Sequence, residues 1–182
     1  MSSPAQPSLP TISETNHLSL SEFTQVISLL FEPTALLTRR IYDSRPFESY
    51  DKLLDRASEL IRDLSPLEQL EVVNAHPRIG EKTTNLSALS CMEQGTKSAN
   101  EDQVMAKWAE LNREYEAVYG FRFVVFVNGR SKESLFPIAR ERIAHGNKNR
   151  ELATGLSEMV DIARDRVRKL QKTASKSQSP KI

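Results

Sequence analysis

Apolar side chains recur every three or four residues along most of this chain, which predicts amphipathic helices. The segments 23–31, 101–119 and 149–171 show this spacing. It is clearest in residues 49–64, where one face carries Leu53, Leu54, Ala57, Leu60, Ile61 and Leu64. No alternation of strand and helix patterns accompanies these segments. The pattern therefore argues against a doubly wound sheet and predicts an all-α fold.

Helix boundaries are marked by local signals. Ser19-Leu20-Ser21-Glu22 and Ser65-Pro66-Leu67-Glu68 are typical capping sequences, in which Ser caps the helix and Glu reaches back to it. The helix that starts at Pro66 is expected to end near Ala75, because Pro77 disfavours helical geometry at His76.

The chain is long enough for one self-sufficient domain, which we expect to contain seven or eight helices. Residues 1–16 are rich in Ser, Pro and Thr and are predicted to be flexible, and residues 172–182 to be a disordered tail. The domain then covers residues 17–171. Within it, residues 121–127 resemble a strand by propensity but have no partner strand, so they are expected to be buried extended chain.

Composition and charge exclude several classes of function. Lys and Arg number 25 and Asp and Glu 24, so no basic excess points to nucleic acid or to an anionic membrane surface. No apolar run is long enough to span a membrane. Cys91 is the single cysteine, and with three histidines it does not offer the usual zinc spacing. We therefore expect a reducing compartment and neither a metal nor an organic cofactor.

The first candidate for chemistry is His76. It ends a predicted helix, and Pro77 constrains the chain that follows. The helix dipole is expected to favour the protonated imidazole, which suits general acid and base catalysis. The alternative is a histidine that merely caps its own helix.

A second candidate lies in the long segment 77–99, which we interpret as a functional loop. Ser90-Cys91-Met92-Glu93-Gln94-Gly95 places a hydroxyl, a carboxylate and an amide close together, and these groups suit a ligand with several amides. The alternative is a solvated helix end closed by Gly95. A hydrolase that uses Cys91 with His76 is a further alternative, although nothing nearby in sequence activates the thiol.

A third candidate is Arg166. The last predicted helix has an apolar stripe made of Leu152, Leu156, Met159, Ala163 and Leu170, and Arg166 falls on this stripe while Arg164 and Arg168 do not. A guanidinium that faces the core needs an anionic or carbonyl partner. Its planar fork suits a carboxylate or a ureido carbonyl. The alternatives are a side chain that reaches water or one that pairs across a dimer interface.

Taken together, the motifs resemble one family. They are His76-Pro77-Arg78-Ile79-Gly80, Ser90-x-x-Glu93-Gln94, Leu111-Asn112-x-x-Tyr115, Gly120-Phe121-x-Phe123 and Gly129-Arg130-Ser131-Lys132. Their order and spacing, over residues 18 to 168, are similar to those of the 2-oxo-4-hydroxy-4-carboxy-5-ureidoimidazoline (OHCU) decarboxylases. The resemblance implies an all-α homodimer that needs no cofactor and releases CO₂ from OHCU to give (S)-allantoin in urate breakdown.

The resemblance also implies a set of site residues. His76 and Glu93 match the catalytic residues, and the positions that match substrate-binding residues are Pro77, Ser90, Gln94, Phe123, Val124, Val125, Phe126, Val127 and Arg166. Two positions depart from the family pattern. Arg122 stands where the family often has Pro, and Tyr119 where it often has Phe.

Two other functions remain open at this point: a non-catalytic helical interaction module and an inactive member of the family. The final residues, Pro180-Lys181-Ile182, are similar to a Ser-Lys-Leu peroxisomal address in degenerate form. We therefore expect a peroxisomal location, with the cytoplasm as the alternative.

Overall fold

The computed structural model describes residues 8–32, 34–81 and 101–177, with side chains described as far as residue 172. These residues form eight α-helices, one short 3₁₀ helix and no strand. The helices are α1 (Ile12–His17), α2 (Leu20–Ser28), α3 (Ala35–Asp43), α4 (Tyr50–Arg62), α5 (Pro66–Ala75), α7 (Glu101–Tyr119), η2 (Glu133–Leu135), α8 (Phe136–His145) and α9 (Lys148–Ser177). The all-α prediction is confirmed.

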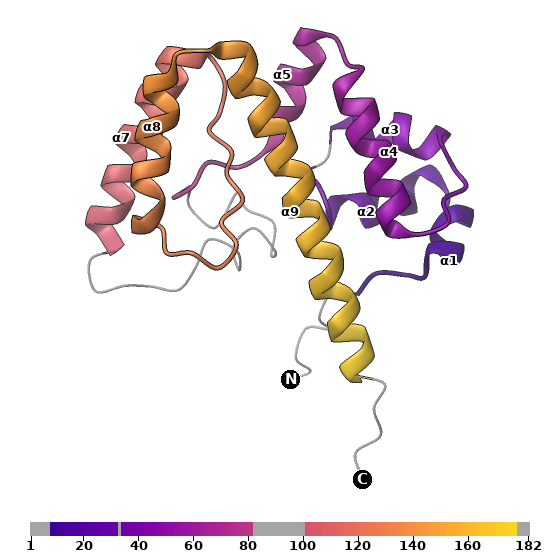
Figure 1. Ribbon diagram of the computed structural model, residues 1–182. Helices are drawn as coiled ribbons and strands as arrows, with labels where there is room; N and C mark the ends of the chain where they lie inside the picture. Colours follow the sequence, from indigo (N-terminus) through magenta and orange to yellow (C-terminus); the bar gives the residue numbers. More distant parts are fainter. Residues whose placement is uncertain (1–7, 33, 82–100, 178–182) are drawn as a thin grey trace.

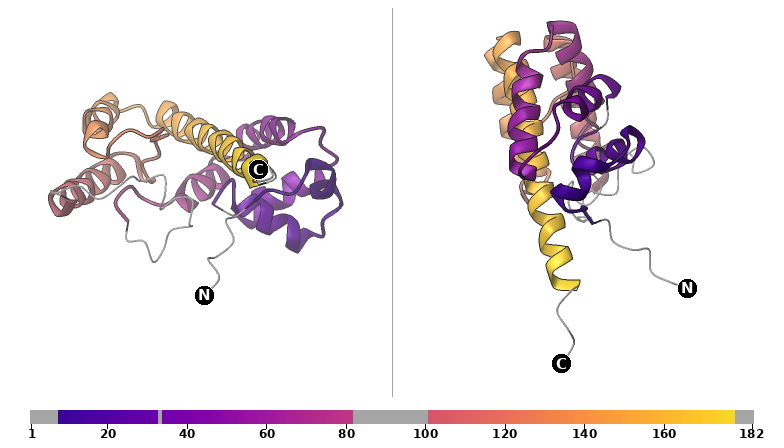
Figure 2. Two further views of the ribbon diagram at one scale, coloured as in Figure 1. Left: turned by 90° about the horizontal axis from the view of Figure 1, so that it is seen from below. Right: turned by 90° about the vertical axis from the view of Figure 1, so that its right-hand side faces the viewer.

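The long helix α9 organises the molecule. It runs between the group α1–α4 on one side and the pair α7 and α8 on the other (Figure 1). Figure 2 shows the same two groups on opposite sides of α9 when the molecule is seen from below. Helices α4 and α5 both pack against α9, and α7 packs against α8. As a result, α9 lies between the two groups of helices.

The predicted capping sequences do start helices. Ser19 accepts from the N–H of Glu22 at the start of α2, and Ser65 accepts from that of Glu68 at the start of α5. In both cases the glutamate side chain accepts from the backbone N–H of the cap, which satisfies a second helix-end donor. The apolar stripe of α4 faces the core, and Leu53 is completely buried there. Burying one such side chain stabilises the fold by about 1.5–3 kcal/mol.

The N-terminal end of the described chain differs from its prediction. The segment 1–16, expected to be flexible, contains most of α1, because Thr11 and Glu14 form a third capping box that the Ser- and Pro-rich composition obscured. The hydroxyl of Thr15 is buried and lies 2.8 Å from the hydroxyl of Tyr50. This contact ties α1 to α4.

Helix α9 also differs from its prediction, because it continues to Ser177, beyond the expected end at residue 171. Helix α8 begins at Phe136, and Pro137 lies in its first turn. A first-turn proline costs nothing there, because its missing N–H would have had no partner within the helix.

Residues 121–127 link α7 to η2 without forming a helix or a strand, as predicted. Aromatic packing keeps them inside: Phe123 is buried, stacks on Trp108 with 5.9 Å between ring centroids, and meets Tyr115 edge-on at 5.1 Å. The segment ends in a turn at Asn128 and Gly129, both with positive φ.

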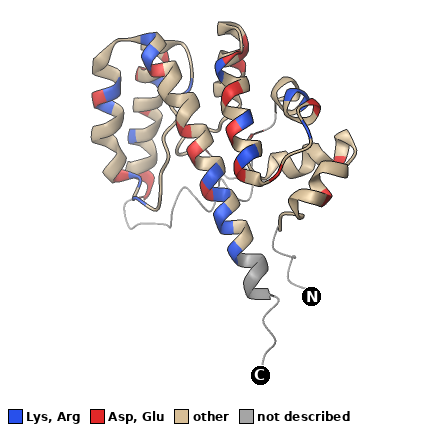
Figure 3. Cartoon of the chain, turned by 45° about the vertical axis from the view of Figure 1, so that its right-hand side comes forward, with Lys and Arg blue, Asp and Glu red and all other residues tan. Residues whose placement is uncertain are grey.

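The charged residues of both signs occur along α4 and along α9 (Figure 3). In the part of the chain that the structure describes, no helix is both long enough and apolar enough to cross a membrane.

Candidate active site

His76 lies at the C-terminal end of α5 and caps it. Its backbone N–H donates to the carbonyl of Val73 at 3.3 Å, and its ψ of 136° turns the chain out of the helix, as Pro77 requires. Arg122, from the buried segment, fastens this helix end. Its backbone N–H donates to Asn74 Oδ1 at 3.0 Å, and its guanidinium donates to the carbonyl of His76 at 2.9 Å. The imidazole therefore stands on a backbone that is held from two sides.

The protonation state of His76 differs from the prediction. Burial and, to a smaller extent, the positive charges of Arg166 and Arg122 together lower its pKa from 6.5 to about 3. The expectation that the helix dipole favours the imidazolium is wrong, because an exposed helix end contributes only about 0.3–1 kcal/mol. Desolvation and two guanidinium groups outweigh that effect. His76 is neutral at physiological pH.

A pocket opens beside His76 and Pro77. Its lining also includes Phe123, Val125, Phe126 and Val127 from the buried segment, and Ile162, Asp165 and Lys169 from α9. Two of the predicted groups of site residues, one at the end of α5 and one in the segment 123–127, thus meet at this pocket, and α9 lines it as well.

Asp165 and Lys169 are pocket residues that sequence reasoning missed. They form an ion pair with 2.6 Å between Lys169 Nζ and Asp165 Oδ2. The signal that would have found them is the spacing of residues 162, 165 and 169, which places all three on one helical face beside the stripe that carries Arg166.

The wall at residues 123–127 has two different edges. The carbonyl of Val124 accepts from Arg142 at 2.8 Å, and the N–H of Phe126 donates to Glu158 at 2.6 Å. Val124 does not line the pocket, unlike its neighbours. Within the described residues no protein group accepts from the N–H of Val125 or Val127. Since alternate residues of extended chain present their backbone groups to opposite edges, the N–H groups of Val125 and Val127 lie on the edge opposite the one that Glu158 and Arg142 contact. Both residues line the pocket.

Arg166 points inward, as the stripe predicts, and its exposed fraction is 1%. Its Nη1 donates to the carbonyl of Leu30 at 3.3 Å, and its Nη2 lies 3.6 Å from a carboxylate oxygen of Glu32. The lining of this pocket does not include Arg166, so its proposed contact with substrate stays a prediction. Its charge nevertheless acts on His76. Arg164, off the stripe, pairs instead with Asp55 at 2.7 Å.

The remaining predicted site residues are Ser90, Glu93 and Gln94, together with Cys91 of the alternative hydrolase. They lie outside the described residues. Their roles stay predictions.

The sequence is similar to those of several known proteins. The model of the OHCU decarboxylase family matches residues 16–168. A 2-oxo-4-hydroxy-4-carboxy-5-ureidoimidazoline decarboxylase of Haloferax volcanii is 29% identical over 157 residues, which are 84% of this chain and 91% of that protein. The uric acid degradation bifunctional protein of Bacillus sp. (strain TB-90) is 28% identical over 161 residues, 87% of this chain. The chain spans 32% of that bifunctional relative.

Two solved structures have the same fold. A crystal structure of OHCU decarboxylase in the presence of (S)-allantoin superposes with a TM-score of 0.61 at 23% identity, and covers 75% of this chain and 90% of its own. A crystal structure of (S)-allantoin synthase gives a TM-score of 0.64 at 18% identity, with 90% of this chain and 54% of that one covered.

Proposed function

Because the chain belongs to the OHCU decarboxylase family, we propose that it converts OHCU to (S)-allantoin and CO₂ in urate degradation. The observation that carries the proposal is that a histidine and a stretch of extended backbone meet at one pocket. His76 lines the same pocket as Phe123, Val125, Phe126 and Val127. The histidine supplies a base and the backbone supplies donors for the carbonyl groups of a ureido-bearing ring.

The proposed reaction balances without a cofactor. The bond between the ring carbon and the carboxylate breaks, CO₂ leaves, and the electron pair moves toward the adjacent C=N bond, whose nitrogen takes up a proton from solvent. The resulting enol loses its hydroxyl proton, and a proton is added at the carbon that carries the ureido group. The product is allantoin, and addition at one face gives one enantiomer.

The place of His76 in the pocket lining suggests its role in this scheme. Its imidazole is placed to accept the hydroxyl proton of the substrate. The site must also stabilise the charge that develops on the ring, and the N–H groups of Val125 and Val127 are suited to that task. Glu93 is proposed to orient His76 or the substrate, and Ser90, Gln94 and Arg166 to bind the substrate's polar groups.

The proposal is tested by generating OHCU freshly from urate with the upstream enzymes and following its decay and the chirality of the product. We expect the protein to accelerate the decay and to yield (S)-allantoin. His76→Asn should lose about 10²–10⁴-fold in rate while it keeps its helicity. His145→Asn is the matched control, because His145 also ends a helix but is exposed at the surface.

A decay rate equal to the uncatalysed one would favour the inactive family member or the interaction module instead. Near-normal turnover in His76→Asn would move the chemistry to another residue. The resemblance to the family further supports a homodimer, for which light scattering on the purified protein should give twice the chain mass of 20.6 kDa.

A further inference from the structure

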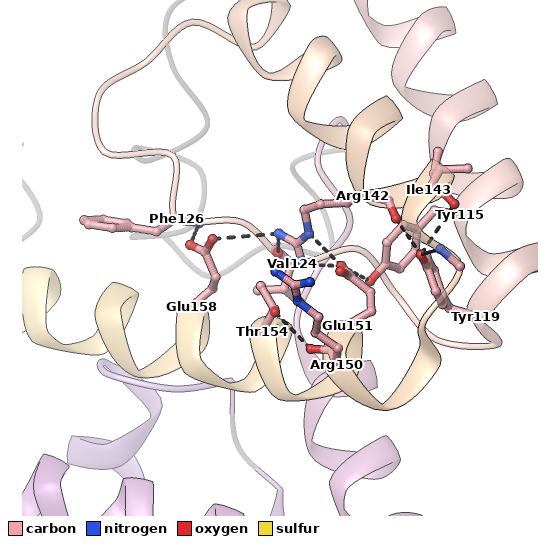
Figure 4. A network of polar contacts seen from close by, with 11 residues as sticks. Tyr115, Tyr119, Val124, Phe126, Arg142, Ile143, Arg150, Glu151, Thr154 and Glu158 are labelled. Atoms are coloured by element: carbon pink, nitrogen blue, oxygen red, sulfur yellow. Dashed lines mark hydrogen bonds and ion pairs between the residues drawn. The ribbon is translucent and has the colours of Figure 1, made fainter.

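Among the described residues no strand pairs with residues 124–126, and side chains from two helices contact this stretch instead. Glu158 on α9 accepts the N–H of Phe126, and Arg142 on α8 donates to the carbonyl of Val124 (Figure 4). The two contacts fall on alternate residues, so they hold one edge of the wall as a neighbouring strand would.

The two side chains that make these contacts are themselves fixed. Arg142 is 8% exposed, and its Nη1 lies 3.7 Å from a carboxylate oxygen of Glu158. Its Nε donates to the buried carboxylate of Glu151 at 2.6 Å, and its guanidinium lies over the ring of Phe123 at 4.7 Å. Tyr115 donates to the same carboxylate at 2.7 Å. Buried charges in such a network have few alternative positions.

We propose that Glu158 and Arg142 are positioning residues of the active site, which hold one edge of the wall so that the N–H groups of Val125 and Val127 face the pocket. We call these two contacts, Glu158 to the N–H of Phe126 and Arg142 to the carbonyl of Val124, the clamp. Because both contacts are made to fixed residues, the backbone cannot slide by one residue without breaking them. The inference rests on the proposed function, because it assigns those two N–H groups to the substrate. A displacement of about 1 Å in such donors typically costs about 10²-fold in rate.

Two substitutions of Glu158 separate the clamp from general stability. Glu158→Gln keeps an oxygen that accepts the N–H of Phe126, whereas Glu158→Leu keeps a similar volume without an acceptor. We expect kcat/KM for OHCU to fall about 10²-fold in Glu158→Leu, and to stay within severalfold of the original in Glu158→Gln. Asp161→Ala, an exposed carboxylate on the same helix, is the control for charge and should leave the rate unchanged.

Amide hydrogen exchange supplies a readout that does not depend on turnover. In Glu158→Leu the amides of residues 124–127 should exchange faster, while those of α7 and α4 keep their protection. If Glu158→Leu does not fold, Arg142→Lys replaces it. The planar guanidinium of Arg142 contacts the Val124 carbonyl and the Glu151 carboxylate at once, whereas a lysine ammonium has no such fork and cannot make both contacts. It should produce the same faster exchange and the same loss of rate.

A folded Glu158→Leu with unchanged kcat/KM and unchanged exchange would overturn the proposal. Equal losses in Glu158→Gln and Glu158→Leu would also overturn it, since the acceptor would then not matter. If the unmodified protein does not accelerate OHCU decay, the proposed function fails, and the exchange experiment still decides whether the clamp exists.

Discussion

The low pKa of His76 predicts how the free energy of unfolding depends on pH. In the unfolded chain the imidazole titrates at about 6.5, and in the folded protein at about 3. Between these values the unfolded state binds a proton that the folded state does not. Stability contributed by this group is therefore fully present above pH 6.5, and it is lost progressively as the pH falls toward 3.

The size of the effect follows from the two pKa values. One unit of pKa corresponds to about 1.4 kcal/mol, so the full shift sets an upper bound of about 5 kcal/mol. Between pH 7 and pH 4 the expected loss is about 3 kcal/mol. Asn at position 76 cannot titrate, so His76→Asn should lack this part of the pH dependence.

The assay is urea unfolding followed by circular dichroism at pH 7 and at pH 4. Carboxylates elsewhere titrate in both proteins, so their contributions cancel in the comparison. The unmodified protein should lose about 3 kcal/mol more than His76→Asn over this range, and His145→Asn should behave like the unmodified protein. Equal losses in the unmodified protein and in His76→Asn would refute the reasoning, because His76 would then titrate alike in the folded and unfolded states.

Three further outcomes are expected. Arg166→Ala should strongly lower kcat/KM, and Arg166→Lys should restore it poorly, because an ammonium lacks the planar fork of a guanidinium. Arg164→Ala should be nearly neutral, because a surface ion pair contributes about 0–1 kcal/mol. If steady-state kinetics gave a normal kcat/KM for Arg166→Ala, the role of Arg166 would be structural. Gly80→Ala should lower the melting temperature more than Gly146→Ala, because a Cβ at Gly80 would lie 3.2 Å from Trp108 Cβ and one at Gly146 meets nothing within 4 Å. Exhaustive chelation should leave the decarboxylation rate unchanged, and a tenfold loss restored by one divalent ion would contradict this.

The position of His76 was predictable because its causes are local. Pro77 ends the helix by steric conflict with the residue before it, and the Ser65 cap begins the helix ten residues earlier. The protonation state was not predictable, since it follows from the burial of the imidazole and from the charges of Arg166 and Arg122. Both arginines are distant in the sequence, and only the folded chain brings them near.

For Arg166 and for the pocket wall too, the features with local causes were predictable and those that depend on distant residues were not. Periodicity predicts that Arg166 faces inward, but its partner carbonyl at Leu30 is 136 residues away and leaves no trace in the local pattern. Apolar composition predicts that residues 121–127 are buried, yet it does not tell which edge is held. The contact that decides this is made by Glu158, which reads in the sequence as an ordinary polar residue of an amphipathic helix.

The single helix α9 carries Glu151, Glu158, Asp165 and Arg166, so the distances and rotations between these four side chains are fixed by helical geometry. Each added residue turns the rest of a helix by about 100° and advances it by about 1.5 Å. One inserted residue between Glu151 and Glu158 would therefore swing the wall contact and the pocket face away together. Four inserted residues would restore the orientation to within about 40° but displace both by about 6 Å. The interval from residue 151 to residue 166 is therefore expected to be sensitive to changes in length.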